Sequence, residues 1–204
     1  MEIKVLAFAA SPRRHGNSET LLDWVIAAME EKDGVVVEKV VLNEADVNPC
    51  WGCNACEKLN RCVQDDGMTV LYDQIVDADV VVLALPVYCL GVCAQAKALI
   101  DRTQVFRSRK YVLHLPIVPP ERAGKRVGLL IATAGQTWPY VFDGAVASVK
   151  CFFHVSAIRG QETRYLLING VDKAGAVETH PTARTEAAAI ADEVMALITE
   201  RLSA

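Results

Sequence analysis

The chain has 204 residues, of which 52% are apolar, and a formal net charge of −4. This length suits one domain over residues 1–204 with a sizeable core, and no basic run is long enough to predict a nucleic-acid surface. The longest apolar run, 80–87, is far shorter than the roughly 18 residues that a membrane span needs, and the N-terminus has no basic leader, so we expect a cytoplasmic protein without a membrane partner.

Apolar runs and helical periodicities alternate along the chain. The run Ile3–Ala9 is typical of a buried strand, and from Asn17 onward apolar residues recur at helical spacing. The pattern predicts strands at 3–9, 35–42, 79–85, 126–133 and 154–158, and helices from 17, up to 76, at 92–105, at 140–151 and from 181. Such alternation predicts an α/β fold in which helices cover both faces of a doubly wound parallel sheet. A cysteine-rich insertion at about 48–68 and a long surface connection at about 106–125 interrupt the pattern.

The loop after the first strand is rich in hydroxyl, amide and cationic groups. Ligands of an open parallel sheet bind beyond the carboxyl ends of its strands, where the next helix offers free N–H groups. The sequence has neither the G-x-G-x-x-G fingerprint of dinucleotide sites nor the G-K-[ST] of a P-loop. We interpret this loop as a site for a phosphate monoester, with an ordinary polar loop as the alternative; the ligands would be Ser11, Arg13, Asn17 and Ser18.

Two later loops carry small and aromatic residues at the same edge of the predicted sheet. After the third strand, Pro86 has no N–H, Tyr88 offers a flat face and Gly91 permits close approach of a planar ligand. The loop 133–138 follows the fourth strand and again contains glycine and hydroxyl groups. One phosphate loop and two such loops together predict a mononucleotide with a planar ring.

Four cysteines follow the spacing C-x2-C-x2-C-x5-C, at Cys50, Cys53, Cys56 and Cys62. Thiolates suit iron–sulfur clusters or zinc, and a reducing cytosol disfavours a disulfide framework. Bacterial ferredoxins begin with the same C-x2-C-x2-C, whereas zinc sites usually set two pairs about a dozen or more residues apart. The spacing favours a [4Fe–4S] cluster over a vestigial or thiol–disulfide role, and over zinc. Cys89 and Cys93 are interpreted as small buried hydrophobic residues, although Cys89 could touch a bound ring.

Two motifs resemble a known family. The patterns S-P-R-x-x-G-N-S at 11–18 and P-V-Y-x5-A-x2-K-x3-D-R at 86–102 are similar to the NADPH-dependent FMN reductase group of the flavodoxin-like superfamily. The cysteine segment resembles that of the iron–sulfur flavoproteins. Two residues depart from the usual patterns: Ala10, which precedes the first motif, and an inserted Gly67 at the end of the cysteine segment. The resemblance implies five strands in the order 2-1-3-4-5, bound FMN, a homodimer or tetramer, and a ferredoxin-like electron donor.

The resemblance also implies roles for individual residues of this chain. It assigns the FMN phosphate to the four residues of the first loop named above. It assigns ring contacts to Pro86, Val87, Tyr88, Cys89, Leu90, Gly91, Thr133, Ala134, Gly135 and Gln136. No catalytic side chain is implied, because the cofactors carry the redox chemistry.

These observations support one leading hypothesis of function and two alternatives. The leading hypothesis is a flavin-dependent oxidoreductase that passes electrons between a [4Fe–4S] cluster, FMN and an unknown acceptor. The first alternative is an NAD(P)H-dependent FMN or quinone reductase without a cluster, in which the nicotinamide binds over the flavin. The second is a binding module in which flavin and thiols report redox state to a partner protein.

Overall fold

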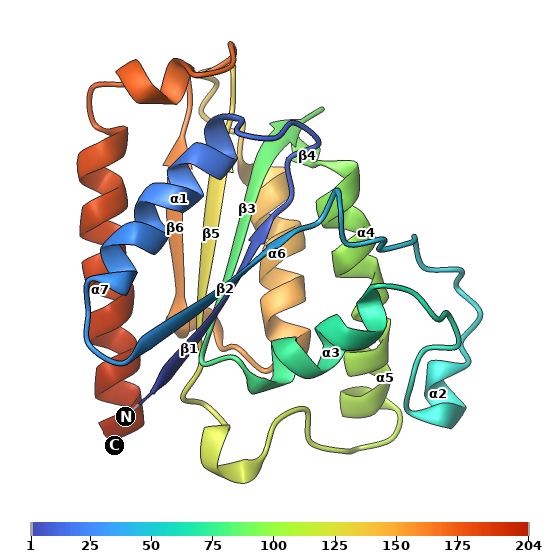
Figure 1. Cartoon of the computed structure of the whole chain (residues 1–204). Coiled ribbons are helices and arrows are strands. Elements are labelled where there is room, and N and C mark those ends of the chain that lie inside the picture. The colour runs from blue at the N-terminus through green and yellow to red at the C-terminus, as the bar shows by residue number, and fades with distance from the viewer. Residues whose placement is uncertain (1, 204) are drawn as a thin grey trace.

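A computed structural model describes residues 2–203 of the chain. Its main sheet has five parallel strands in the order β2-β1-β3-β5-β6 (Figure 1). The strands are β1 (Ile3–Ala9), β2 (Val35–Val41), β3 (Val80–Tyr88), β5 (Val127–Thr133) and β6 (Thr163–Ile168). A two-residue strand, β4 (Gly91–Val92), pairs antiparallel with the end of β3. The predicted α/β class and the predicted order of the five main strands are confirmed.

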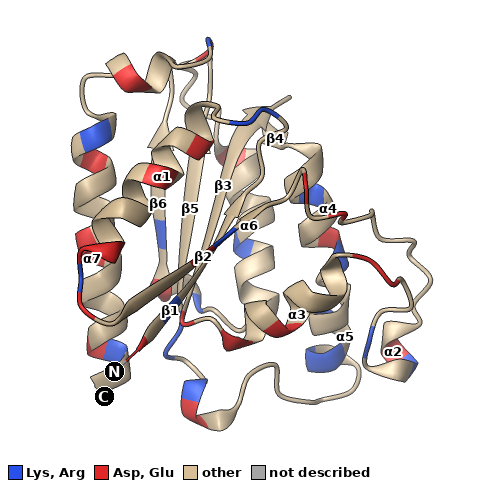
Figure 2. Ribbon diagram, viewed as in Figure 1, with Lys and Arg blue, Asp and Glu red and all other residues tan. Residues whose placement is uncertain are grey.

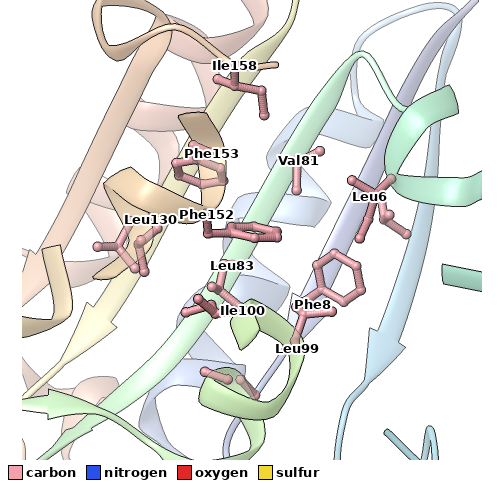
Figure 3. Packing of buried hydrophobic residues seen from close by; sticks show 14 of the residues in the cluster. Leu6, Phe8, Val81, Leu83, Leu99, Ile100, Leu130, Phe152, Phe153 and Ile158 are labelled. Atoms are coloured by element: carbon pink, nitrogen blue, oxygen red, sulfur yellow. The ribbon is translucent and has the colours of Figure 1, made fainter. Parts of the chain in front are cut away.

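Helices cover both faces of the sheet because the strands are apolar on both faces. Along β1, Leu6 and Phe8 enter one core, while Val5 and Ala7 enter the other. Figure 3 shows Phe8 of β1 and Leu83 of β3 in the first core, with Phe152 of a covering helix. The helices are α1 (Asn17–Glu30), α2 (Cys56–Leu59), α3 (Met68–Asp77), α4 (Ala94–Arg102), α5 (Gln104–Tyr111), α6 (Asp143–Val155) and α7 (Ala183–Ser203).

Different helices cover the two faces of the sheet. Helices α1 and α7 pack on one face, and α3, α4 and α6 pack on the other (Figure 1). Three short 3-10 turns complete the chain: η1 (Pro120–Arg122), η2 (Gly160–Glu162) and η3 (Ala176–Thr179). Within residues 2–203, no helix combines the length and the apolar character that crossing a membrane requires.

The prediction of a strand at 154–158 is wrong, because these residues end helix α6. Ala157 adopts a left-handed conformation with φ 63°. The Ala157 N–H binds the His154 carbonyl oxygen, and the Ile158 N–H binds that of Phe153. This is a Schellman helix end, in which Ile158 packs into the same core as Phe153. The fifth main strand is β6, which begins at Thr163.

The predicted helix 92–105 and the predicted surface connection 106–125 also differ from the structure. Val92 belongs to β4, and the helical stretch divides at Thr103, whose hydroxyl binds the Ile100 carbonyl oxygen at 2.6 Å. Helix α5 then continues to Tyr111. Farther along, Ile117 and Val118 are buried in the core, so the later part of this connection packs against the protein.

The inserted Gly67 is explained by close contact between two backbone segments. A Cβ atom at this position would lie 1.6 Å from the Ala45 carbonyl oxygen, which is far inside van der Waals contact. The Gly67 N–H also binds the Asp46 carbonyl oxygen at 3.2 Å. The glycine therefore fastens the end of the cysteine-rich insertion to the turn that follows β2.

We expect Gly67→Ala to lower the free energy of unfolding by at least about 2 kcal/mol, because backbone must move to admit the methyl group. Urea unfolding followed by circular dichroism would measure this. Gly160→Ala is the matched control, since a Cβ atom there meets nothing within 4 Å, and its effect should stay within about 0.5 kcal/mol. Equal stability of the two variants would contradict the proposed backbone contact.

Candidate functional site

The three loops predicted from the sequence meet in one pocket beyond the carboxyl ends of the strands. The pocket has a volume of about 210 Å³, and a fourth segment, 171–174, completes it. The predicted residues that line it are Ser11, Arg13, Asn17, Ser18, Pro86, Val87, Tyr88, Thr133, Gly135 and Gln136. Cys89, Leu90 and Ala134 line an adjoining hollow that shares Val87, Gly135 and Gln136 with the pocket. Gly91 lines neither hollow and pairs with Tyr88 instead.

The start of helix α1 gives the pocket an anion-binding end. Gly16 caps this 14-residue helix without any side-chain hydrogen bond. Its carbonyl oxygen accepts the Thr20 N–H, while the N–H groups of Asn17 and Ser18 take part in none of the hydrogen bonds within residues 2–203. Free N–H groups and the positive end of the helix dipole attract phosphate. Ser11, Ser18 and the cationic Arg13 line the same pocket.

The side chain of Asn17 fastens the fourth segment of the pocket. Its Nδ2 donates to the carbonyl oxygens of Val171 and Lys173, each at 2.9 Å, and its Oδ1 accepts the Val177 N–H at 3.2 Å. The amide group is thus engaged with the segment 171–177. Because its side chain is occupied in this way, Asn17 can contribute to ligand binding by positioning that segment and by offering its backbone N–H.

A buried acid stabilises the loop 11–18, which we call the phosphate loop after its predicted ligand. The Glu19 side chain is 1% exposed and accepts the N–H of His15 at 2.6 Å, which fixes a residue with positive φ. Lys39 binds the same carboxylate at 2.9 Å, and Arg14 lies 3.3 Å away. Burial raises the pKa of Glu19, but the hydrogen bonds from Lys39 and His15 outweigh burial and lower it. The loop is therefore held by an ionised carboxylate whose charge is balanced locally.

A tight hairpin forms the opposite side of the pocket. Cys89 and Leu90 both have positive φ, 49° and 62°, as a two-residue turn between β3 and β4 requires. Cys89 is exposed, so its interpretation as a buried residue is wrong. Cys93 is buried as expected, its thiol donates to the Ala10 carbonyl oxygen at 3.0 Å, and burial raises its pKa.

The sequence analysis missed the fourth segment, represented by Val171, Asp172 and Ala174. Asp172 explains the neighbouring Gly135, because a Cβ atom there would lie 2.7 Å from the Asp172 carboxylate. The segment follows the carboxyl end of β6, so the rule that found the other loops would have found it. The error in placing the fifth strand concealed it.

The four clustered cysteines line a separate small cavity. All four are free thiols, and they share the cavity with Trp51 and Arg102. The Gly52 N–H lies 3.4 Å from Cys50 Sγ, while Cys56 Sγ lies 3.2 Å from Ser108 Oγ. Within residues 2–203, no three His, Cys, Asp or Glu side chains are already arranged to hold a metal ion. The donor set therefore fits a thiolate-bound metal group, while the sulfur atoms do not form a closed metal site.

A buried ion pair closes the cysteine segment. Arg102 binds Asp66 through two hydrogen bonds, at 2.5 and 2.9 Å, and also donates to the Asn48 carbonyl oxygen at 3.0 Å. The two side chains are 0% and 4% exposed. Burial raises the pKa of Asp66, but Arg102 and Asn48 outweigh burial and lower it to about 2. One guanidinium therefore connects both ends of the segment 48–66.

The cysteine cavity and the pocket share no lining residue. In Figure 1 the cysteine segment and α2 lie at the right of the molecule, whereas the phosphate loop and β4 lie at the top. The structure therefore presents two distinct sites. One suits a phosphate-bearing planar ligand, and the other offers four thiols.

Comparison with known proteins identifies the family. The family model described as NADPH-dependent FMN reductase matches residues 3–139, so the chain belongs to this family. An iron-sulfur flavoprotein from Archaeoglobus fulgidus is 35% identical over 137 residues, which cover 67% of this chain and 57% of that protein. One from Methanocaldococcus jannaschii is 35% identical over 105 residues, or 52% of this chain and 54% of that protein. The chain thus spans little more than half the length of these curated relatives.

A solved structure supports the fold. The FMN-dependent NADH-azoreductase from Bacillus anthracis, in complex with FMN, superimposes with a TM-score of 0.66 at 14% identity. The match covers 94% of this chain and 99% of that chain. The predicted family and the predicted resemblance to iron–sulfur flavoproteins are confirmed, as is the flavodoxin-like fold.

We expect the ion pair of Asp66 to make stability depend on pH in acid. The ordinary pKa of this carboxyl group is 3.8, and folding lowers it to about 2. Asp66 therefore contributes about 2 kcal/mol above pH 5, and this contribution disappears as the pH falls through 2. Urea unfolding of the wild type and of Asp66→Asn should differ most at pH 5 and progressively less toward pH 2.

The neighbouring Asp65→Asn is a control for the loss of one charge, since Asp65 forms no ion pair within residues 2–203. At neutral pH its free energy of unfolding should stay within about 0.5 kcal/mol of the wild type. A constant difference between wild type and Asp66→Asn from pH 5 to pH 2 would contradict the assigned role of the ion pair.

Proposed function

We propose that this protein is a cytoplasmic, FMN-binding oxidoreductase that holds an iron–sulfur cluster and passes electrons to an acceptor that is still to be identified. The observation that carries the FMN assignment is the uncapped start of α1, which faces a pocket formed by three further loops. Membership of the NADPH-dependent FMN reductase family supports the same ligand. The redox chemistry belongs to the flavin, while the protein binds and orients it.

The FMN phosphate is assigned to the phosphate loop. Ser11 and Ser18 offer hydroxyl groups, Arg13 offers positive charge, and α1 offers its free N–H groups. Asn17 keeps the segment 171–177 against the pocket. The ring is assigned to the opposite side, between the hairpin that carries Tyr88 and the loop 133–136, which includes Thr133, Ala134, Gly135 and Gln136.

The four clustered cysteines are assigned to a [4Fe–4S] cluster. Their common cavity and free thiols support this assignment, as does similarity to proteins named iron-sulfur flavoproteins. Such a cluster would supply single-electron transfer, and N–H groups near the sulfur atoms raise its potential. Gly52 provides one N–H of this kind, beside Cys50. Arg102 and Asp66 keep the segment closed around the cavity.

The assembly is proposed to be a homodimer or tetramer that receives electrons from a ferredoxin-like donor. Exposed apolar side chains near the proposed position of the flavin ring support self-association. Tyr88, Leu90, Trp138 and Tyr140 are between 38% and 52% exposed there. Trp138 and Tyr140 stack with 5.8 Å between ring centroids, which forms a flat surface that a second copy would cover.

The second candidate function is an NAD(P)H-dependent FMN or quinone reductase without a cluster. The hollow that adjoins the pocket favours it, because its residues include Val87, Leu90 and Trp138 and would leave space for a planar substrate beside the flavin ring. No dinucleotide fingerprint is needed if the nicotinamide stacks on the ring. The two candidates differ in whether the cysteines hold iron.

We expect Asn17→Ala to weaken FMN binding ten- to hundredfold, because the segment 171–177 loses its three hydrogen bonds to Asn17 and must then be ordered at the expense of binding free energy. Calorimetric titration of flavin-free protein with FMN would measure the dissociation constant. Asn43→Ala is a suitable control, since Asn43 does not line the pocket. An unchanged affinity in Asn17→Ala would refute this role.

We expect protein purified without oxygen to contain about four irons and four acid-labile sulfides per FMN, as a [4Fe–4S] cluster requires. Iron, sulfide and zinc would be measured together. Cys53→Ser should lose the iron, whereas Cys89→Ser should keep it, because only Cys53 lines the cysteine cavity. If the wild type contains flavin but no iron, the second candidate function, a reductase that has no cluster, becomes the better assignment.

A further inference from the structure

A third hollow lies beside the cysteine cavity and has no role in the function proposed above. It has a volume of about 400 Å³, which falls in the range of small-molecule sites. One side comes from the residues after α2, and the other from α3 and α5. Tyr72 and Phe106 form part of an apolar wall, where their rings meet edge to face at 5.6 Å.

Charged groups around this hollow have no partners in the part of the chain that the structure describes. Arg61, Asp65, Asp73 and Arg109 line it, and none of these side chains forms an ion pair or a hydrogen bond within residues 2–203. Figure 2 shows the basic stretch on α5 and the acidic stretch that leads into α3. By contrast, Arg102 and Arg107, which both precede Arg109 in the sequence, are each paired with a carboxylate.

Arg109 is the most informative of these residues. Its Nε is shielded from solvent and has no hydrogen-bond partner. Its two Nη atoms are not shielded and form no hydrogen bond or ion pair within residues 2–203. They are therefore the donors that an anion in the hollow can reach.

We infer that this hollow binds a small organic monocarboxylate with an apolar body. The carboxylate would bind the Arg109 guanidinium, whose fork of donors matches it, and the body would pack on Tyr72 and Phe106. Asp65 and Asp73 disfavour a ligand with a second negative charge.

The position of Cys62 connects this hollow to the proposed cluster site. Cys62 lines both this hollow and the cysteine cavity, so a ligand in the hollow would occupy space next to the fourth proposed cluster ligand. The ligand should therefore alter the surroundings of the cluster. This second step depends on the proposed cluster, whereas binding of the carboxylate does not.

The test uses the full chain with 1-naphthylacetate as the probe and the neutral 1-naphthylacetamide as its matched analogue. Calorimetry should show at least tenfold tighter binding of the acid than of the amide. Arg109→Gln should weaken binding of the acid at least tenfold and leave the amide unchanged, because only the acid forms the charged hydrogen bonds. Arg107→Gln is the control, since Arg107 lies on the same helix, pairs with Glu57 and does not line the hollow.

Separate outcomes test the two steps. Equal affinity of acid and amide, no binding at millimolar concentration, or unchanged binding in Arg109→Gln would overturn the site. In protein that contains iron, the acid should change the electron paramagnetic resonance spectrum of the reduced cluster, and Arg109→Gln should abolish that change. If the protein holds no iron, the acid should still bind, so failure of the cluster assignment is distinguishable. An unchanged spectrum in iron-containing protein that binds the acid would overturn only the link to the cluster.

Discussion

The parallel direction of the five main strands is the constraint on which both proposed sites depend. Parallel neighbours need crossover connections, and every main strand ends at the same edge of the sheet. The loops after β1, β3, β5 and β6 therefore meet in one pocket. The crossover from β2 to β3 passes the intervening β1 and contains the cysteine segment before α3 begins. The same topology thus gathers one set of loops and extends another segment away from them.

The cysteine segment depends more on side chains than on regular secondary structure. Between β2 and α3 the only helix is the four-residue α2, so residues 48–66 have few backbone hydrogen bonds of their own. Arg102 replaces them with its bonds to Asp66 and the Asn48 carbonyl oxygen. Removing one partner of such a pair leaves an uncompensated buried charge, which is strongly destabilising. Arg102 also ends α4, the helix that follows the hairpin beside the pocket. The motif at 86–102 therefore runs from one site to the other through a tight turn and one helix.

Sequence patterns predicted most of the fold because its strands are apolar on both faces and its helices follow their usual period. They also located three of the four loops of the pocket, since strand ends determine where ligands bind. The misplaced fifth strand had a specific cause. Ala157 takes the left-handed position at a helix end where glycine is the usual signal, and Ile158 then resembles part of an apolar strand. The bonds from Asn17 to residues 171–177, and from Arg102 to Asp66, join parts of the chain that no local pattern relates.

The three arginines at 102, 107 and 109 show how packing gives one residue type different functions. Arg102 is buried and pairs with Asp66 through both Nη atoms, while Arg107 is exposed and pairs with Glu57 at 3.3 Å. Arg109 is partly buried without any partner in the described chain. Attraction to the negative end of the α5 dipole could account for a cation here, and it accounts equally well for the adjacent Lys110. It does not account for the hollow and the apolar wall beside Arg109, because a cation placed for the dipole alone would extend into water. An unpaired guanidinium against an apolar wall is more easily explained by an anionic ligand that pairs with it.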